Sequence, residues 1–306
     1  MVIMDKKDIL ISLLSSLNYN NVMVDEPLKN HTFTKLGGKA DFYVTPSNYI
    51  EIIKVVKLCN KYQIPLTLIG NGSNLIIKDG GIRGIVMSLM KLNTIKIRGN
   101  YIIAQSGAML SMCSVEALNS NLTGFEFACG IPGTVGGALY MNAGAYEGEI
   151  KDIIDYCYVI TSEGNLKRID KDDLNLSYRS SILQKSKDIV IEATFKLNEG
   201  NYDTIKAKMD DLRIKRVTKQ PLEYPSCGSV FKRPQGHYTG KLITDCDLKG
   251  YNIGQAEVST KHAGFIINKG GATAKEYISL INHIQETVYK KFQVHLEPEV
   301  KIIGED

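Results

Sequence analysis

The sequence has 306 residues, of which 43% are hydrophobic and 23% are charged, and its net charge is +4 at pH 7. This composition is typical of a soluble globular chain with room for two or three domains, and it excludes a largely disordered protein. The charge is too small for a nucleic-acid partner to be predicted, and no cluster of Lys and Arg resembles a basic arm, although small anionic ligands remain possible.

The first apolar stretch, from Ile9 to Leu14, follows Asp5 and Asp8 and has no small-residue cleavage site after it. We therefore expect an amphipathic helix here and not a signal peptide. Nothing in the sequence approaches the roughly 20 apolar residues that span a membrane. The six cysteines, at positions 59, 113, 129, 157, 227 and 246, form no CxxC pair and no Cys/His cluster. They predict no metal site, reduced and mostly buried thiols, and a cytoplasmic location.

Apolar residues recur at helical spacing from 48 to 62, with Ser47 as the expected N-cap. The next segment, IPLTLIGNGSNLIIKDGGIRGIVMSL, predicts a strand, a glycine loop, a short strand, a Gly-Gly turn and a further strand. In a Rossmann fold the glycine loop opens a helix, so this order argues against that fold.

The loop Gly70-Asn71-Gly72-Ser73-Asn74 has a second possible use. Glycines allow successive N–H groups to point into one concavity, which binds a phosphate without a helix, and Ser73 and Asn74 add donors. Taken alone, GNGSN is more typical of a tight β-turn, so a phosphate site here needs support from elsewhere in the chain.

Strands over LNTIKI and YIIAQ and a helix over 108–120 are expected next, and a second glycine-rich stretch follows them. It reads GFEFACGIPGTVGGALYMNAGAYEGE and has seven glycines between Gly124 and Gly148. So many glycines carry a large entropic cost on folding, which indicates that the backbone turns tightly or that another group lies close to it. The stretch is too apolar for a flexible linker. We expect a buried loop that wraps a large planar or phosphorylated ligand.

The remaining elements are predicted from local signals. A hairpin over a Ser-Glu-Gly-Asn turn, the strand DIVIEATFKL, and a helix from Tyr202 to Thr218 with a mostly solvated basic face should follow in order. Thr273 and Glu276 predict a capping box on a helix with an apolar stripe. The stripe comprises Ile278, Ile281, Ile284, Val288 and Phe292.

The chain ends on VHLEPEVKII, which alternates like a strand. Val294, Leu296, Val300 and Ile302 should share one face, and Glu299 should point to the other with His295 and Lys301. Upstream, YPSCGSVFKRP contains Ser229, and by itself this stretch predicts a turn at Pro225 and Gly228, an apolar strand and surface cations.

Five motifs, taken together, resemble the UDP-N-acetylenolpyruvoylglucosamine reductase family. They are GNGSN after a strand, CGIPGTVGGALYMNAGAY, the Tyr-Arg of LSYRSS, SCGSVFKRP and LEPEVKIIG, in that family's order and spacing over nearly the whole chain. The resemblance implies an α+β chain with the two-subdomain FAD-binding fold of the vanillyl-alcohol-oxidase/p-cresol-methylhydroxylase type and a C-terminal α+β substrate domain. It implies a first subdomain of residues 1–68 with 293–306, a second of 69–200, and a substrate domain of 201–292.

The same resemblance implies a non-covalent FAD whose pyrophosphate lies on the two glycine-rich loops, with Arg216 near the flavin. The implied cofactor-binding residues in the loops are Gly70, Asn71, Gly72, Ser73, Asn74, Gly130, Ile131, Pro132, Gly133, Thr134, Gly136 and Gly137. Lys219, Lys232 and Tyr178 match positions implied to bind the substrate.

The implied reaction reduces UDP-N-acetylglucosamine enolpyruvate to UDP-N-acetylmuramate for peptidoglycan synthesis, in two half-reactions of which the first uses NADPH. By this resemblance Arg179 faces the charge that develops on the substrate carboxylate, and Glu299 assists from the other side. Ser229 would donate a proton to the carbon next to this carboxylate, provided that a nearby cation stabilises the serine alkoxide that results. Lys232 and Arg233 are both candidates for that support or for binding the diphosphate.

The sequence departs from longer family members, which carry an inserted loop with a tyrosine after the region of Arg179, and so resembles a short class. What covers the uridine diphosphate is therefore open, with Tyr224 and Tyr238 as candidates. Cys227 is expected to be a packing residue. Two alternatives are an oxidase of the same fold with covalent FAD, in which Cys129 would be the residue to test, and a non-catalytic nucleotide-binding module. We expect a monomer or a weak oligomer.

Overall fold

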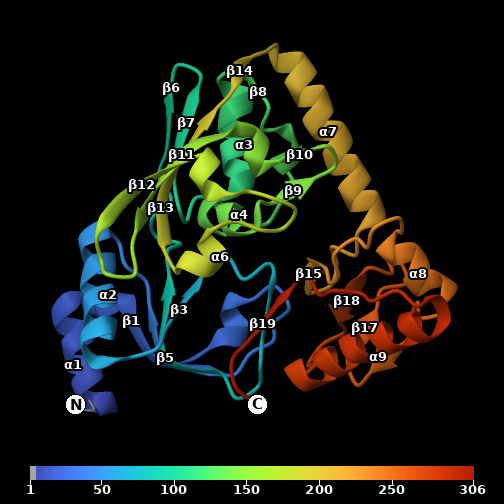
Figure 1. Cartoon of the computed structure of the whole chain (residues 1–306), viewed down its shortest axis with the longest axis horizontal. Helices are drawn as coiled ribbons and strands as arrows, with labels where there is room; N and C mark the ends of the chain where they lie inside the picture. Colours follow the sequence, from blue (N-terminus) through green and yellow to red (C-terminus); the bar gives the residue numbers. More distant parts are fainter. Residues whose placement is uncertain (1–4) are drawn as a thin grey trace. The chain divides into compact units, whose positions relative to one another are not determined.

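The computed structural model describes residues 5–306, and the chain forms two compact units (Figure 1). Unit 1 comprises the residues up to Asp25, Asp41–Asn71 and Gly84–Ile214, and unit 2 comprises Glu26–Ala40, Gly72–Arg83 and Lys215–Asp306. Each unit is therefore assembled from segments that are far apart in the sequence.

A four-stranded sheet lies mostly in unit 1, with two helices packed against each other beside it. The helices are α1 (Lys6–Ser16) and α2 (Tyr49–Tyr62), and the strand order is β1 (Val22–Pro27), β2 (Lys39–Val44), β5 (Ile82–Ser88) and β3 (Leu66–Ile69). The predicted N-cap of α2 is wrong by one residue. Asn48 accepts a hydrogen bond from the N–H of Glu51 at 3.0 Å, whereas the Ser47 hydroxyl donates to the Glu51 carboxylate.

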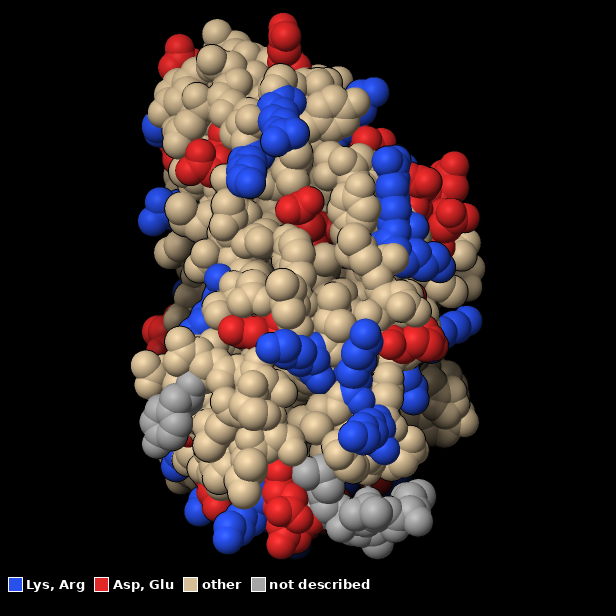
Figure 2. Space-filling model, turned by 90° about the vertical axis from the view of Figure 1, so that its left-hand side faces the viewer, with Lys and Arg blue, Asp and Glu red and all other residues tan. Residues whose placement is uncertain are grey.

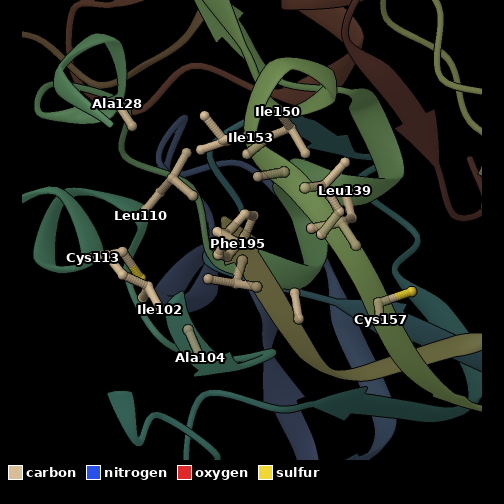
Figure 3. Close-up of a cluster of buried hydrophobic side chains, with 14 of the residues drawn as sticks. Ile102, Ala104, Leu110, Cys113, Ala128, Leu139, Ile150, Ile153, Cys157 and Phe195 are labelled. Atoms are coloured by element: carbon tan, nitrogen blue, oxygen red, sulfur yellow. The ribbon is translucent and has the colours of Figure 1, made fainter. Parts of the chain in front are cut away.

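The second sheet of unit 1 is antiparallel and has five strands. Their order is β12 (Leu166–Asp170), β11 (Ile154–Ile160), β13 (Ile189–Lys196), β7 (Tyr101–Gln105) and β6 (Ile95–Arg98), which confirms the predicted hairpin. Helices α3 (Leu110–Asn119) and α4 (Val135–Met141) pack on it. Figure 3 shows Phe195 of β13 among Leu110, Leu139 and Ile150, so one apolar core joins the sheet to its helices.

The glycine-rich stretch from 124 to 148 is not one buried loop, so that prediction is wrong in part. It contains a 3₁₀ turn (Glu126–Ala128), helix α4 and the two short paired strands β9 (Gly144–Ala145) and β10 (Gly148–Glu149), and α5 (Ile150–Ile153) follows. The helix forms because its apolar residues are buried against the sheet, although the glycines hide its periodicity. A Cβ on Gly136 would lie 2.1 Å from the Ser106 hydroxyl, so this glycine allows helix α4 to lie close to Ser106.

The other elements of unit 1 are short, except for one long helix. They are β8 (Leu122–Thr123), β14 (Asn198–Glu199), α6 (Leu183–Ser186), a 3₁₀ turn at Asp172–Leu174 and most of α7 (Tyr202–Lys219). Helix α7 buries only Ile205 and Leu212, which confirms that most of its cations are solvated. Two further 3₁₀ turns lie at Tyr19–Asn21 in unit 1 and at Leu28–His31 in unit 2.

Unit 2 is built on a four-stranded sheet, a long helix that contacts two of its strands, and a shorter helix that contacts the long one. The strands, in order, are β15 (Ser226–Ser229), β18 (Phe265–Asn268), β17 (Ala256–Val258) and β16 (Asn252–Ile253), and the helices are α8 (Thr239–Asp245), which was not predicted, and α9 (Ala274–Phe292). The parallel pair β4 (Leu75–Ile77) and β19 (Lys301–Ile303) joins the end of the chain to the strand after the GNGSN loop.

The predicted capping box of α9 is confirmed, since Thr273 and Glu276 bond each other's backbone N–H groups. The carboxylate of Asp79 adds two more bonds, to the N–H groups of Ala274 and Lys275. The predicted stripe is correct at Ile281, Ile284 and Val288, whereas Ile278 and Phe292 are only half-buried. Tyr277 and Leu280, which the prediction omitted, are fully buried in their place.

The C-terminal strand is shorter than predicted, because regular pairing covers only Lys301–Ile303. Leu296 and Val300 are buried as expected, while Val294 and Ile302 are half-buried. The residues before β19 are instead held by single hydrogen bonds and an isolated bridge to the segment after β15, so the full alternation does not form.

The described residues bear on several expectations from composition. All six cysteines are free, and four of them are buried. Residues 5–306 contain no group of three or more His, Cys, Asp and Glu that could hold a metal ion, and none of the helices they form could cross a membrane. On the face shown in Figure 2, Lys and Arg alternate with Asp and Glu, without a broad basic area.

Candidate active site

The first half of the GNGSN loop contacts the second glycine-rich loop within unit 1. The side-chain amide of Asn71 donates to the Pro132 carbonyl at 2.7 Å, and a Cβ on Gly70 would lie 2.8 Å from the Thr134 hydroxyl. Thr134 is also the N-cap of α4. The two segments that the sequence assigns to one cofactor therefore lie against each other here.

The second half of the loop belongs to unit 2. Gly72 has φ +65°, and a Cβ there would lie 2.1 Å from the His31 carbonyl oxygen, so only glycine fits. Asn74 donates from its side chain to the Glu299 carbonyl at 3.3 Å, and its own carbonyl accepts from the N–H of Lys301 at 3.1 Å. The loop is thus tied to the C-terminal segment that carries the predicted glutamate.

Ser229 and Glu299 come from two segments that pair with each other. The N–H of Glu299 donates to the Val230 carbonyl at 2.7 Å, and Phe231 forms an antiparallel bridge with Pro298. Ser229 is exposed and Glu299 is half-buried. A hydroxyl and a carboxyl that are 70 positions apart in the sequence are in this way brought onto segments that are hydrogen-bonded to each other.

Arg179 occupies a tight turn in unit 1 with φ +54°, an uncommon value for a residue with a side chain. Its guanidinium donates to the Gly144 carbonyl at 3.0 Å and lies 5.0 Å from the ring of Tyr178. The turn is closed by hydrogen bonds in both directions between Ser177 and Ser180, and it rests on Asn142.

Asn142 is a supporting residue that the sequence analysis missed. It is fully buried with φ +42°, donates to the Ser177 carbonyl at 3.0 Å and accepts from the N–H of Lys151 at 2.9 Å. A left-handed Asn after a helix is a weak C-cap signal in sequence, and nothing in the motif MNAGAY says which loop it holds.

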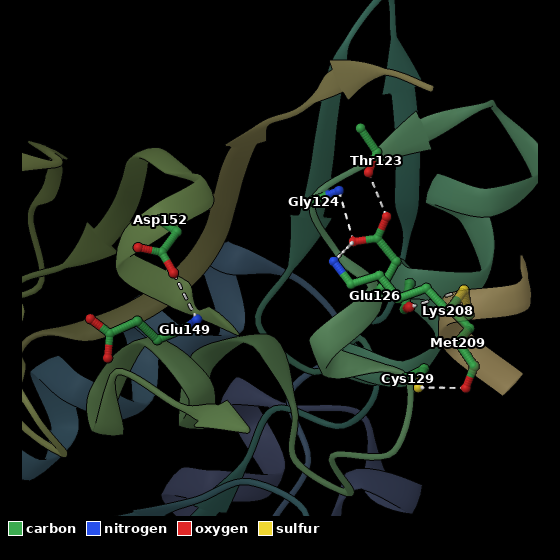
Figure 4. Close-up of polar contacts among 9 residues, drawn as sticks. Thr123, Gly124, Glu126, Cys129, Glu149, Asp152, Lys208 and Met209 are labelled. Atoms are coloured by element: carbon green, nitrogen blue, oxygen red, sulfur yellow. Dashed lines mark hydrogen bonds and ion pairs between the residues drawn. The ribbon is translucent and has the colours of Figure 1, made fainter. Parts of the chain in front are cut away.

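Helix α7 is fixed to unit 1 by a buried carboxylate (Figure 4). Glu126 is 2% exposed, accepts from the Thr123 hydroxyl at 2.6 Å and the Gly124 N–H at 3.0 Å, and lies 3.8 Å from the ammonium group of Lys208. The Cys129 thiol contacts the carbonyl of Met209 at 3.7 Å. Figure 4 also shows the Asp152 carboxylate accepting from the Glu149 N–H.

The last turn of α7 carries the predicted Arg216 and Lys219, which belong to unit 2. Lys232, another predicted substrate ligand, forms an ion pair with Glu297 at 2.5 Å. Its neighbour Arg233 lies 4.0 Å from the ring of Tyr238. Each of these two cations therefore has a protein contact of its own in the described structure.

Cys227 is the packing residue that the sequence predicts. It is 3% exposed, its thiol lies 3.3 Å from the hydroxyl of Tyr277, and burial raises its pKa to about 11. A thiol with that pKa stays protonated at neutral pH and is a poor nucleophile.

The predicted site residues form two groups, one in each unit. Unit 1 holds Gly70, Asn71, Gly130–Gly137, Tyr178 and Arg179, and unit 2 holds Gly72–Asn74, Arg216, Lys219, Ser229, Lys232 and Glu299. Two features of unit 1 fit a large phosphorylated cofactor. A Cβ on Gly137 would meet only the Thr134 hydroxyl, at 3.5 Å, so protein packing does not require this glycine. The buried Ser88 hydroxyl, opposite Ile69 and so beside Gly70, lacks a hydrogen-bond partner in the described protein.

Comparison with known families gives two matches within the chain. Residues 40–170 match an FAD binding domain, and residues 220–303 match the UDP-N-acetylenolpyruvoylglucosamine reductase, C-terminal domain. The two matches divide the chain into a cofactor part and a family-specific part.

Among solved structures, UDP-N-acetylenolpyruvylglucosamine reductase from Thermus caldophilus superposes with a TM-score of 0.80 at 31% identity, over 92% of this chain and 97% of the other. The glucose dehydrogenase Phl p 4.0202 gives a TM-score of 0.52 at 16% identity, over 63% of this chain and 44% of the other, a likeness of fold alone. The predicted α+β architecture is thus confirmed: an FAD-binding fold of the vanillyl-alcohol-oxidase/p-cresol-methylhydroxylase type with a C-terminal domain.

Curated relatives match the chain over nearly its full length. The UDP-N-acetylenolpyruvoylglucosamine reductase of Oceanobacillus iheyensis is 60% identical over 94% of this chain and 93% of its own. That of Geobacillus thermodenitrificans is 56% identical over 96% of this chain and 97% of its own. The chain therefore belongs to the UDP-N-acetylenolpyruvoylglucosamine reductase family and is an FAD-dependent oxidoreductase.

Proposed function

We propose that this enzyme reduces UDP-N-acetylglucosamine enolpyruvate to UDP-N-acetylmuramate in peptidoglycan precursor synthesis, with NADPH as the source of the hydride. The observation that carries the proposal is the pairing of the Ser229 and Glu299 segments. Binding alone does not require a hydroxyl beside a carboxyl on paired segments, whereas protonation of a carbon next to a carboxylate requires a positioned proton donor.

When bound, FAD supplies hydride transfer between NADPH and the terminal vinyl carbon of the substrate. The protein then has to stabilise the charge that this addition pushes into the substrate carboxylate. We assign that role to Arg179, because a guanidinium grips a carboxylate at two points and its charge is permanent. The Gly144 carbonyl and the Asn142-supported turn hold the guanidinium in one orientation before substrate binds.

Ser229 supplies the proton in this proposal. Its O–H bond breaks as a C–H bond forms at the carbon next to the carboxylate, and the resulting alkoxide regains a proton from water. A hydroxyl is a weak acid, but a carbon that carries enolate charge is a strong base, so close placement makes the transfer feasible. Glu299, held beside Val230, assists from the other side of the substrate by a hydrogen bond, directly or through water.

The remaining assignments of the sequence analysis stay as parts of this proposal. Residues of both glycine-rich loops and Arg216 bind the cofactor, and Lys219, Lys232 and Tyr178 bind the substrate. The division into 1–68 with 293–306, 69–200 and 201–292 is proposed as the domain plan. Six free cysteines support a reducing compartment, and we propose the cytoplasm.

A direct assay tests the function. The purified protein should be yellow, with absorption bands at roughly 370 and 450 nm, and should release free flavin on denaturation. Addition of UDP-N-acetylglucosamine enolpyruvate should stimulate NADPH oxidation and yield a product heavier by two hydrogens. UDP-N-acetylglucosamine, which lacks the vinyl group, is the matched control and should give no stimulation. Equal rates with both sugar nucleotides would remove the proposal.

Replacing Gly137 with alanine is expected to weaken FAD binding by about 10-fold without lowering the melting temperature of the apoprotein. A methyl group there meets only one hydroxyl at an ordinary contact distance, and alanine suits a helix better than glycine. Flavin titration and thermal melting measure the two effects. Gly72→Ala, which would strike the His31 backbone, should instead lower the melting temperature. Unchanged FAD affinity in Gly137→Ala would exclude a cofactor contact at this glycine.

A further inference from the structure

A β-bulge precedes Ser229 in strand β15. Ser226 is paired with Ile267 and Ser229 with Phe265, so three steps along β15 match two steps along β18. Cys227 and Gly228 therefore lie opposite the single residue Ile266. Bulges of this kind change the direction of a side chain and are frequent beside active sites.

The bulge turns Ser229 out of the core. In a regular strand Cys227 and Ser229, two positions apart, would point to the same face of the sheet. Instead, Cys227 is 3% exposed within the apolar cluster of unit 2, while Ser229 is exposed. Gly228 between them has φ +77°, and a Cβ there would meet no atom within 4 Å. The glycine is thus needed for its backbone conformation and not for space.

Tyr277 of helix α9 contacts both strands at the bulge. The Tyr277 hydroxyl donates to the Ile266 carbonyl at 2.6 Å. The Cys227 sulfur lies 3.3 Å from the oxygen of that hydroxyl. A phenol hydroxyl has one proton. Because Tyr277 donates that proton in its hydrogen bond to the Ile266 carbonyl, the Cys227 thiol must be the donor in the contact with Tyr277. Burial raises the pKa values of both groups, so both stay protonated at neutral pH and the order of donors is fixed.

The Tyr277 hydroxyl and its two hydrogen bonds, to Cys227 and Ile266, form an anchor for the bulge. This anchor is rigid, because Tyr277 is fully buried on a 19-residue helix whose first turn is capped by Thr273, Glu276 and Asp79. Regular hydrogen bonds resume on both sides of the bulge, from Asn268 to the Pro225 carbonyl and from Val230 to the Gly264 carbonyl. At the bulge, the Tyr277 hydroxyl adds a side-chain hydrogen bond to the Ile266 carbonyl.

We propose that Tyr277, through the Cys227 thiol and the Ile266 carbonyl, is a positioning residue that holds the Gly228 bulge and so aims the Ser229 hydroxyl at the substrate carbon. This inference rests on the proposed function, since only reduction of the enolpyruvyl group gives Ser229 a carbon to protonate. It adds to that function a residue which contacts neither substrate nor cofactor and acts only through the serine.

The test is Tyr277→Phe, which removes the hydroxyl and keeps the ring, with Tyr158→Phe on β11 as a control. Stopped-flow absorbance of the flavin separates its reduction by NADPH from its reoxidation by the enolpyruvyl substrate. In Tyr277→Phe we expect reoxidation to slow by between about 10-fold and about 100-fold, with a larger solvent deuterium isotope effect and unchanged reduction. A merely structural role would lower the melting temperature without changing the isotope effect.

A second readout does not depend on activity. Iodoacetamide labelling of the holoprotein, resolved by peptide mass spectrometry, should modify Cys227 at least about 10-fold faster in Tyr277→Phe than in the parent, because the bulge opens more often. Reoxidation at the parental rate with a parental isotope effect would overturn the proposal, whatever the labelling rate. An unchanged labelling rate would overturn the anchor itself.

Failure of the proposed function and failure of the variant to fold can each be told apart from failure of this proposal. If the parent shows no substrate-dependent reoxidation, the proposed function fails, while the labelling experiment still decides whether Tyr277 holds the bulge. If Tyr277→Phe does not fold, Cys227→Ala removes only the thiol contact and is expected to slow reoxidation with the same isotope signature. Parental kinetics in Cys227→Ala would contradict the proposal.

Discussion

Replacing Ser229 with alanine is expected to lower the rate of flavin reoxidation by the enolpyruvyl substrate by between about 10²-fold and about 10⁴-fold, the range typical for loss of a general acid. Reduction by NADPH should keep its parental rate, because this step requires no proton at the substrate carbon. Single-turnover absorbance measurements of the two half-reactions separate the effects. Because Ser229 is exposed, loss of its hydroxyl should not change folding.

Ser226→Ala is the matched control for this variant. Ser226 lies in the same strand, on the other side of the bulge, and pairs with Ile267 in the same sheet. It should leave both half-reactions unchanged, since its side chain is not on the segment that pairs with the Glu299 region. Undiminished product formation by Ser229→Ala would remove the serine from the mechanism and leave the proton to water or to Glu299.

Local signals predicted the elements whose stability is local. The hairpin of β11 and β12, the capping box at Thr273 and Glu276, and the strand, glycine loop and strand around Gly70 were all readable, because turn and cap residues act within a few positions of the chain. The error at Ser47 and the exchange of Ile278 for Tyr277 in the stripe of α9 are shifts of one residue, which tertiary packing decides.

The missed elements depend on contacts with distant segments. Helix α4 has glycines at two of its first three positions, and it forms because its apolar face packs on the β13 sheet. Helix α8 and the strands around Ala256 are similarly short and gain their stability from α9. No window of a few residues contains that information.

The sequence suggests the residue types and motifs of the proposed site but not its geometry. The sequence places Ser229 and Glu299 in separate motifs, and only the fold pairs their segments through Val230. The bulge at Gly228 is invisible in a sequence where Gly after Cys also reads as an ordinary turn. Asn142 was missed for the same reason, because its partner, the Ser177 carbonyl, is 35 positions away.

Replacing Arg179 with lysine is expected to lower kcat for reduction of the enolpyruvyl substrate by about 10²-fold while flavin reduction by NADPH stays unchanged. Lysine keeps the charge and tolerates the backbone, since Lys35 and Lys187 have φ values of +58° and +60° in this chain. What it lacks is the planar fork that grips a carboxylate at two points while Gly144 holds the guanidinium. Arg168→Lys, on a solvent-exposed ion pair with Asp170, is the control and should be silent. A parental kcat in Arg179→Lys would mean that charge alone suffices and that the turn around Ser177 and Asn142 serves stability, because a point charge on a flexible stem needs no such precise support.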